Sequence, residues 1–296
     1  MIPARPGMLF RVASISKIFT AAALCRLSES GRVRLDDPAE KWLPEGSLSR
    51  IKGHREITVR LLLNHRSGID DYDERAILAL QRAQPASPVE VGFAISQGLD
   101  KGPLYAPDGG YTYSNVNYLL LSLVIDSASG TSYERCMRDT IIDPLGLTNT
   151  YTPTDPSAAA LPEPFMGCLC VENNEPADYS ATYKMYDRGA GDIISTVQDL
   201  NAFHEALREC RIIDRTSLAQ MEDFHSASTH GYGLGYMRRR DDASGVTLVG
   251  HEGAYPGSWT RLYYWVEADT YIAANVNGGP ANVVAPIISY LQQELR

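Results

Sequence analysis

The chain has 296 residues, 44% of them hydrophobic, and a formal net charge of −9 at pH 7. A chain of this length buries a sizeable core as one large domain or as two interleaved ones. The negative charge argues against nucleic acid and anionic membranes as partners, because both attract basic surfaces.

The first half of the chain is predicted to be mainly helical. An apolar helix begins at Phe10, passes through Ser14 and runs to about Ser30, where Gly31 ends it. Pro38 follows two aspartates and is typical of the first turn of a short helix. Caps and stop residues predict further helices at 59–65, 89–99, 115–129 and 132–142.

The second half of the chain is predicted to change from helix to strand. Residues 152–190 are irregular and contain several prolines, and Ser195 and Gln198 have the spacing of a capping box for a helix at 197–209. A helical part followed by a meander of strands predicts an α+β fold. The strands are expected at 232–239, 246–250, 260–266 and 271–276, with a hairpin turn at 267–269 and an amphipathic helix at 283–295.

The candidate nucleophile is the first residue of Ser14-Ile15-Ser16-Lys17. Three residues apart on a helix, the serine and lysine side chains share a face. A hydroxyl becomes a good nucleophile when a neutral amine accepts its proton, and the apolar neighbours of Lys17 are expected to lower its pKa by desolvation. At a helix N-terminus Ser14 also has backbone N–H groups that can stabilise an oxyanion.

The alternative interpretation of this motif is a capping serine beside a surface lysine, because S-x-x-K is a common pattern. The chain contains its own comparison, Ser49-Arg50-Ile51-Lys52. That segment follows Pro44 and Gly46 and has no apolar helix behind it, so we interpret it as a loop. The apolar helix after Ser14 is what favours catalysis there.

The second motif is Tyr113-Ser114-Asn115, which opens the helix predicted at 115–129. A tyrosine beside a lysine and a serine can relay protons. An asparagine can hold a substrate amide through its donor and its acceptor. The alternative is structural, with Asn115 as a helix cap and Tyr113 as a packing residue.

The third motif is His251-Glu252-Gly253, within a predicted strand context. A glycine in a strand lets a substrate backbone lie close to the strand edge. The side chain two residues earlier points to the same face, where it can contact a substrate carboxylate or carbonyl. Taken alone, a His-x-Gly pattern is weak evidence for a site.

In this order, the three motifs resemble the S-x-x-K, Y-x-N and [KH]-x-G signature of the serine β-lactamase, penicillin-binding-protein (DD-peptidase) and class C β-lactamase-like esterase superfamily. The segment 10–17 is similar to the approach to the nucleophile in that superfamily, and 61–68 is similar to its LLxHxSG turn. Further similar segments lie at 189–195, 231–235 and 250–257.

The resemblance implies a β-lactamase/transpeptidase-like fold, with an all-helical domain beside an antiparallel sheet flanked by helices and the active site between them. We expect the mainly helical domain at 14–190 and the α/β domain at 1–13 together with 191–296. Ser14 is then the acylated nucleophile, and Lys17 and Tyr113 share the general-base and general-acid roles. Either of these two residues could activate the water that releases the acyl group.

The resemblance also implies how a substrate is held. Asn115 binds the substrate amide, and His251 lines the pocket. The backbone N–H groups of Ser14 and of Ala254, the residue that follows Gly253, form the oxyanion hole. No metal and no organic cofactor are implied.

The implied function is a serine hydrolase that acts on amide, ester or β-lactam substrates, as D-alanyl carboxypeptidases and β-lactamases do, with small molecules or peptides as its partners. One alternative is a carboxylesterase of the class C β-lactamase-like type, for which Tyr255 and Trp259 would line an open aromatic pocket. The other alternative is a catalytically idle binding or scaffold protein with the same fold.

A peptidase that acts on C-terminal D-alanine needs a cation for the substrate carboxylate. His251 stands where many superfamily members have lysine. Arg238 or Arg239, one strand away, could supply the charge. The alternative for both arginines is a solvent-facing strand end.

The N-terminus departs from the superfamily pattern. Similar proteins usually carry a helix and two sheet strands before the serine, whereas 13 residues precede Ser14 here. We therefore expect the strand at 271–276 to have an unpaired edge, which is an aggregation hazard. The two hypotheses are that the chain is shortened at its N-terminus, or that a partner chain covers the edge in an oligomer.

Cysteine usage and the N-terminal residues bear on the compartment. The five cysteines form no C-x-x-C pair, and Cys168-x-Cys170 has no histidine nearby, so a zinc site is not predicted. Free thiols and the lack of a signal peptide favour the cytoplasm, whereas a shortened N-terminus would leave the periplasm or secretion open. The longest apolar stretches, such as 119–125, are too short to span a bilayer.

Overall fold

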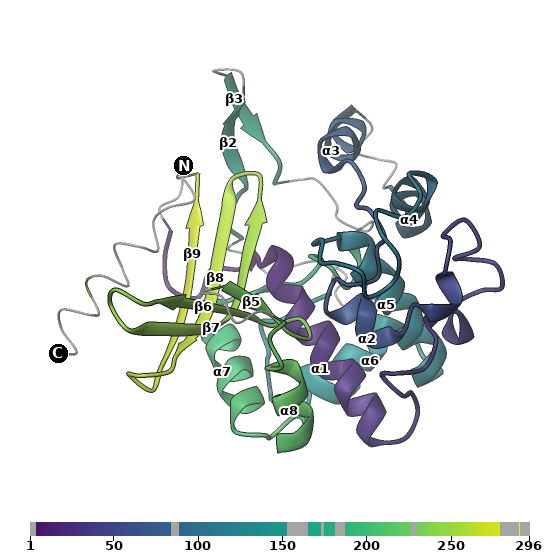
Figure 1. Ribbon diagram of the computed structural model, residues 1–296. Coiled ribbons are helices and arrows are strands. Elements are labelled where there is room, and N and C mark those ends of the chain that lie inside the picture. Colours follow the sequence, from purple (N-terminus) through teal and green to yellow (C-terminus); the bar gives the residue numbers. More distant parts are fainter. Residues whose placement is uncertain are drawn as a thin grey trace.

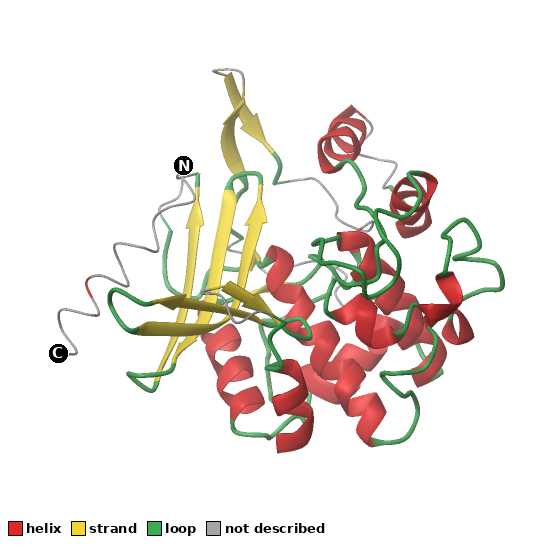
Figure 2. Cartoon of the chain, viewed as in Figure 1, coloured by secondary structure: helices red, strands yellow, loops and turns green. Residues whose placement is uncertain are grey.

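In the computed structural model, helices gather on one side of the molecule and the main antiparallel sheet lies on the other (Figures 1 and 2). The structure describes residues 4–83, 89–152, 165–172, 175–180, 187–225, 230–278 and 290. Helix α1 (Ser16–Glu29) lies between the sheet and the other helices and packs against both α5 and α8. Its N-terminal end is therefore where the two parts of the molecule meet.

The helical part largely follows the predicted positions. Helix α5 has the predicted bounds, Asn115–Ser129, and Gly130 ends it with a φ of 70°. Helix α2 (Val59–Leu63) begins after Thr58, whose hydroxyl accepts a hydrogen bond from the Leu61 N–H. The other elements are η2 (Ala39–Trp42), η3 (His54–Glu56), α3 (Glu74–Ala83), α4 (Val91–Asp100), α6 (Tyr133–Met137) and the π-helix η4 (Arg138–Ile142).

The helical part differs from the prediction in three places. The expected helix start at Phe10 is wrong, because β1 (Phe10–Arg11) pairs with β4 (Ile194–Ser195) and holds this segment extended. The helix expected at 132–142 changes from α to π geometry at residue 138. Helix α3 was not predicted. The comparison motif at 49–52 lies in turns, as expected.

The main sheet is a meander of five antiparallel strands in the order β5-β6-β7-β8-β9. The predicted turn at 267–269 joins β8 to β9 and is confirmed. The strand bounds are His230–Tyr232 for β5, Met237–Asp241 for β6, Val246–Tyr255 for β7, Ser258–Trp265 for β8 and Thr270–Asn277 for β9.

The single strand expected at 232–239 is wrong, because a tight turn divides it into β5 and β6. The Gly233 N–H donates to the Tyr236 carbonyl at 2.8 Å and closes the turn. Gly235 has a φ of 66°, and a Cβ atom there would lie 2.7 Å from the Lys17 carbonyl oxygen. Only glycine fits this turn without strain, because the backbone is left-handed and packs directly on α1.

Two helices cover the sheet on the side shown below it in Figure 1. They are α7 (Val197–Arg208), which packs on β8 and β9, and α8 (Arg215–Met221). The predicted cap of α7 is displaced by one residue. Thr196, and not Ser195, accepts from the Asp199 N–H, because Ser195 is the last residue of β4.

Strand β7 extends beyond its neighbour on one side. Its partner β6 pairs with it only as far as Gly250, whereas β8 pairs with it from Leu248 to Tyr255. The remaining part of β7, from His251 to Tyr255, packs against the 3-10 turn η1 (Ala13–Ile15). This places the third sequence motif beside the candidate nucleophile.

Among the described residues, β9 pairs with β8 alone and is an edge strand of the sheet. A small hairpin of β2 (Leu169–Glu172) and β3 (Glu175–Asp178) projects from the end of the sheet, within the region expected to be irregular (Figure 1). The helix expected at 283–295 lies outside the described residues. No described helix has the length and apolar character needed to cross a membrane.

Candidate active site

Ser14 lies in a strained turn at the entrance to α1. The residue before it, Ala13, has a φ of 50°, which a residue with a side chain rarely adopts. Ser14 is half-buried, whereas the flanking residues Ala13 and Ile15 are buried. The buried neighbours therefore anchor the backbone, while the turn leaves the serine hydroxyl accessible. Backbone strain of this kind is common at functional sites.

Lys17 has no exposed surface. Its Nζ atom donates to the Asn115 Oδ1 atom at 2.7 Å and to the Ala190 carbonyl oxygen at 2.7 Å. The third contact of Nζ is the Ser14 Oγ atom at 3.2 Å. The amide and carbonyl oxygens can only accept, so they take two hydrogens from the amine. The remaining position on Nζ faces the serine hydroxyl, where it can hold either a proton or a lone pair.

Tyr113 completes this group. Its phenol is within hydrogen-bonding contact of Ser14, and its ring centroid lies 4.9 Å from the Lys17 Nζ atom. Burial raises the pKa of Tyr113 well above its usual value, and the hydrogen bond to Ser14 only partly opposes this. The side chain is therefore a neutral phenol near pH 7, able to donate a proton.

Asn115 is held by a carboxylate that the sequence analysis did not identify. Its Nδ2 atom donates to the Asp71 Oδ2 atom at 2.9 Å, while its Oδ1 atom accepts from Lys17. The other oxygen of Asp71 accepts from the backbone N–H groups of Tyr72 and Val116. Asp71 thus caps the N-terminus of α5 and fixes the orientation of the Asn115 amide.

His65 is a second residue that was not singled out as a site residue. It is fully buried, and its Nδ1 atom accepts from the Ser114 N–H at 3.2 Å. Its ring lies 4.4 Å from the ring of Tyr113, centroid to centroid. Burial, followed by the nearby Lys17, lowers the pKa of His65 well below its usual value. A neutral His65 therefore holds the segment that carries Tyr113.

Gly253 lies where β7 approaches the backbone just before the nucleophile. A Cβ atom at this position would lie 2.1 Å from the Val12 carbonyl oxygen and 3.3 Å from the Ala13 side chain. Only a residue without a side chain allows this approach. The next residue, Ala254, is exposed on the same strand edge. The oxyanion-hole role of the Ser14 and Ala254 N–H groups stays a prediction.

We expect Gly253→Ala to lower kcat/KM by about tenfold or more, because relief of the clash displaces β7 from η1 and small misplacements at a reacting centre are costly. The unfolding free energy should fall by about 1–3 kcal/mol, as for other overpacked sites. Steady-state kinetics and urea denaturation measure both effects. Gly92→Ala is the matched control, because a Cβ atom at Gly92 meets nothing within 4 Å. Unchanged activity in Gly253→Ala would contradict the close approach.

His251 faces this group but is already hydrogen-bonded at both ring nitrogens. Its Nδ1 atom lies 2.6 Å from the Glu252 carbonyl oxygen, which can only accept, so Nδ1 carries the proton. Its Nε2 atom then accepts from the Tyr232 hydroxyl at 3.1 Å. Burial, followed by the charge of Lys17, lowers the pKa of His251 to about 3. The imidazole is therefore neutral at ordinary pH.

The two arginines considered for a substrate carboxylate have other contacts. The Arg239 Nη2 atom lies 2.7 Å from the Glu252 Oε1 atom, and the Arg261 guanidinium lies 3.3 Å from the other oxygen of Glu252. The guanidinium of Arg238 lies over the ring of Phe224 at 5.1 Å. Of the residues considered for an open aromatic pocket, Tyr255 is 2% exposed and packs against Tyr179.

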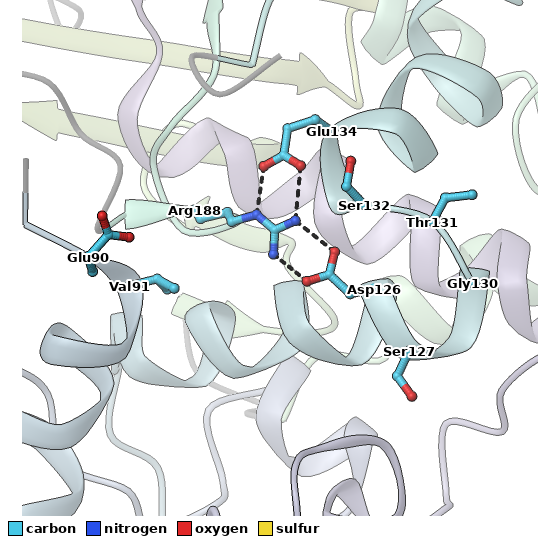
Figure 3. A pocket seen from close by; sticks show the side chains of 9 residues that line it. All are labelled: Glu90, Val91, Asp126, Ser127, Gly130, Thr131, Ser132, Glu134 and Arg188. Atoms are coloured by element: carbon cyan, nitrogen blue, oxygen red, sulfur yellow. Dashed lines mark hydrogen bonds and ion pairs between the residues drawn. The ribbon is translucent and has the colours of Figure 1, made fainter. Parts of the chain in front are cut away.

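The segment that supplies the Ala190 carbonyl is anchored by a buried ion-pair cluster (Figure 3). The guanidinium of Arg188 makes two hydrogen bonds to Glu134 and two to Asp126, at 2.6–3.0 Å. The side chains of Arg188 and Glu134 are only 12% and 8% exposed. This cluster ties the segment before Ala190 to α5 and α6, and so fixes one of the acceptors of Lys17.

Asp192, on the same segment, makes stability depend on pH. Burial, followed by the nearby Asp187, raises the pKa of Asp192 to about 7. The folded state therefore binds a proton between pH 4 and 7 that the unfolded state does not. The stability that this proton contributes is present at low pH and is lost as pH rises through 7. Full loss corresponds to about 4 kcal/mol.

We accordingly expect Asp192→Asn to flatten the decline in unfolding free energy between pH 4 and 7. Urea denaturation at several pH values measures this slope. The exposed Asp242→Asn is the control and should leave the slope unchanged. An equal slope in Asp192→Asn and the parent protein would show that Asp192 does not titrate in this range.

The predicted site residues thus lie around one point. They are Ser14 on η1, Lys17 on α1, Tyr113 just before α5, Asn115 at the start of α5, and His251, Gly253 and Ala254 on β7. Asp71, His65, Tyr232 and the Ala190 carbonyl were missed. His65, Ala190 and Tyr232 fall in segments that were recognised as similar to the superfamily, 61–68, 189–195 and 231–235, which was the available signal for them. Asp71 falls in none of these segments. The described residues include no group of three or more His, Cys, Asp or Glu side chains that could hold a metal ion.

The chain is similar to known proteins over almost its whole length. The family model described as "Beta-lactamase" matches residues 1–295. Penicillin-binding protein 4* from Bacillus subtilis (strain 168) is 28% identical over 285 residues, which cover 90% of this chain and 60% of that protein. The chain thus spans about 60% of the length of this relative.

Two solved structures share the fold over almost the whole chain. A D-stereospecific amidohydrolase from Streptomyces sp. is 32% identical, with a TM-score of 0.86 and coverage of 95% of this chain and 86% of that one. A D-amino acid amidase from Ochrobactrum anthropi SV3 is 26% identical, with a TM-score of 0.78 and coverage of 100% and 87%. The α+β fold is therefore β-lactamase/transpeptidase-like, and the chain belongs to the beta-lactamase family.

Proposed function

We propose that this protein is a serine hydrolase that forms an acyl-enzyme on Ser14 and acts on amides of D-amino acids. One observation carries the proposal: the buried amine of Lys17 lies 3.2 Å from the Ser14 hydroxyl, with two fixed acceptors occupying its other hydrogens. A structural lysine would need no such contact with an accessible hydroxyl. A general base for serine does need it.

The geometry supports the following acylation step. The Ser14 oxygen attacks the substrate carbonyl carbon, and its proton passes to Nζ of Lys17. Tyr113, a neutral phenol, donates its proton to the leaving nitrogen and regains one from Lys17. The C–N bond breaks, the amine departs, and an ester on Ser14 remains. No net proton is gained or lost in this step.

Deacylation reverses the roles. Water attacks the ester carbonyl, and its proton returns through Tyr113 and Lys17 to the serine oxygen. The raised pKa of Tyr113 makes a resting phenolate unfavourable, so we assign Lys17 as the base and Tyr113 as the proton relay. The N–H groups of Ser14 and Ala254 are the proposed donors to the oxyanion.

The substrate class follows from the relatives. One solved structure is named a D-stereospecific amidohydrolase and the other a D-amino acid amidase, and the relative from Bacillus subtilis is named a penicillin-binding protein. Amides of D-amino acids are small molecules with a carbonyl that Ser14 can attack and an amine that can leave, as the proposed acylation step requires. Oligomerisation through the β9 edge stays a prediction.

A substrate panel tests the proposal. It holds the amides of D- and L-phenylalanine, a p-nitrophenyl ester and nitrocefin, each assayed with the parent protein and with Ser14→Ala. We expect faster turnover of the D-amide than of the L-amide, abolished in Ser14→Ala. Turnover of the ester alone would indicate a carboxylesterase. No turnover and no labelling by an acylating probe would indicate an idle binding protein.

A further inference from the structure

Among the described residues, no strand pairs with the β6-side edge of β7 beyond Gly250. Strand β6 pairs with β7 only as far as Gly250, and the next residues pack on η1 beside Ser14. A substrate that binds along an open strand edge meets the side chains that face that edge. The charge that His251 and its neighbours present there decides which leaving groups are accepted.

His251 presents no charge to this edge. Both of its ring nitrogens are engaged, one with the Glu252 carbonyl and the other with the Tyr232 hydroxyl, and the side chain is buried. Protonation would require Nε2 to lose its acceptor role towards Tyr232. Burial also opposes protonation and, followed by the nearby Lys17, keeps the pKa of His251 low.

Glu252 neutralises the positive charges of the arginines nearest to His251 along the strands. Glu252 binds both Arg239 and Arg261 and also accepts from the Tyr263 hydroxyl at 2.5 Å. Arg11 lies over the rings of Phe165 and Tyr255 at 5.7 and 5.6 Å and is 7% exposed. Its guanidinium is directed into aromatic packing at the far end of β7.

Carboxylates, in contrast, lie close to the catalytic group. Asp71 contacts Asn115 directly, and Asp187 accepts from the Tyr72 hydroxyl at 3.0 Å. Burial raises the pKa of the Tyr113 phenol, and both carboxylates raise it further. A substrate carboxylate placed beside Tyr113 would meet the same repulsion.

We propose that the site takes acyl donors with an uncharged leaving group, namely carboxamides and esters, and discriminates against donors that end in a free carboxylate. The geometry of His251, Tyr232 and Glu252 carries this inference, which rests on the acyl-enzyme function proposed above. It separates the protein from peptidases that remove a C-terminal amino acid.

A matched pair of substrates tests it. D-alanyl-D-alanine and D-alanyl-D-alaninamide share the same scissile bond and differ only in the terminal carboxylate, and each is used with a free and with an acetylated amino end. Mass spectrometry follows the released D-alanine or D-alaninamide. We expect kcat/KM to be at least about tenfold higher for the uncharged member, a typical effect of one unpaired charge at a binding site.

Two variants test whether His251 and Glu252 cause the preference for uncharged leaving groups. His251→Lys should raise kcat/KM for the carboxylate substrate by about tenfold, because it supplies the missing cation. Glu252→Gln should raise it more modestly, because it frees the charges of Arg239 and Arg261. If His251→Lys does not fold, the comparison in the parent protein still decides.

The outcomes separate the two proposals. Equal or faster turnover of the carboxylate substrate by the parent protein would overturn this inference alone, and Arg11 would then be the cation to test. No turnover of any substrate and no adduct on Ser14 would overturn the proposed function, and the inference would fall with it. If both variants fold and still prefer D-alanyl-D-alaninamide to the same extent, then His251 and Glu252 are not the cause of the preference.

Discussion

Lys17→Met is expected to lower kcat/KM by about 10³- to 10⁴-fold while the protein remains folded, since a positioned general base contributes up to about 10⁴-fold. Lys17 is fully buried, and its amine is the group that contacts the Ser14 hydroxyl. Methionine has a similar length and no charge, so it fills the same space. Because the Asn115 Oδ1 atom and the Ala190 carbonyl lose their donor, the unfolding free energy should fall by about 1–3 kcal/mol.

The chain offers a matched control for this substitution. Lys52 ends the other S-x-x-K pattern, is exposed and lies in a turn. Lys52→Met should leave both kcat/KM and the melting temperature unchanged. Comparable activity in Lys17→Met and in the parent protein would remove Lys17 from the mechanism. A loss of activity together with a loss of the folded state would be resolved by circular dichroism.

Arg188→Met is expected to have the largest effect on stability, a loss of about 3–5 kcal/mol of unfolding free energy. The substitution leaves Glu134 and Asp126 near one another with no cation between them. It also releases the segment that presents the Ala190 carbonyl to Lys17, so kcat/KM should fall as well. Urea denaturation and steady-state kinetics measure the two effects.

Arg135→Met is the control, because Arg135 is 66% exposed and pairs with Asp139 one turn away. Its loss should cost less than about 1 kcal/mol, as for other surface ion pairs. Adding Glu134→Gln and Asp126→Asn to Arg188→Met should restore part of the lost stability, because the uncompensated charges are removed. Equal effects of Arg188→Met and Arg135→Met would show that the buried cluster does not anchor the segment.

The parts of the fold that were predicted correctly are those with strong local signals. Helix α5 has its predicted bounds because a run of apolar residues is ended by Gly130, which adopts the left-handed conformation. Strands β7, β8 and β9 are rich in β-branched and aromatic residues and are joined by short turns. Their local preferences agree with their tertiary environment.

The errors lie where tertiary packing decides the local structure. The stretch 232–239 reads as one strand, but packing of Gly235 on the Lys17 carbonyl requires a turn there. An apolar residue such as Phe10 fits the predicted helix, but in the structure it lies in a strand and pairs with Ser195, which is far away in the sequence. Neither contact leaves a local pattern in the sequence.

The same distinction holds for the candidate site. Ser14, Lys17, Tyr113 and Asn115 were found because short motifs carry their side-chain types. The Ala190 carbonyl was missed because a backbone acceptor has no residue signature. Asp71 was missed because its contact with Asn115 joins two segments that only the folded chain brings together.

The most direct measurement of the central claim is the position of a covalent adduct. The parent protein is incubated with a fluorophosphonate probe that acylation-competent serines attack, and intact mass followed by peptide mapping locates the label. The account predicts one adduct, on Ser14, absent from Ser14→Ala and strongly slowed in Lys17→Met. An adduct on another residue, or equal labelling of Ser14→Ala, would contradict it.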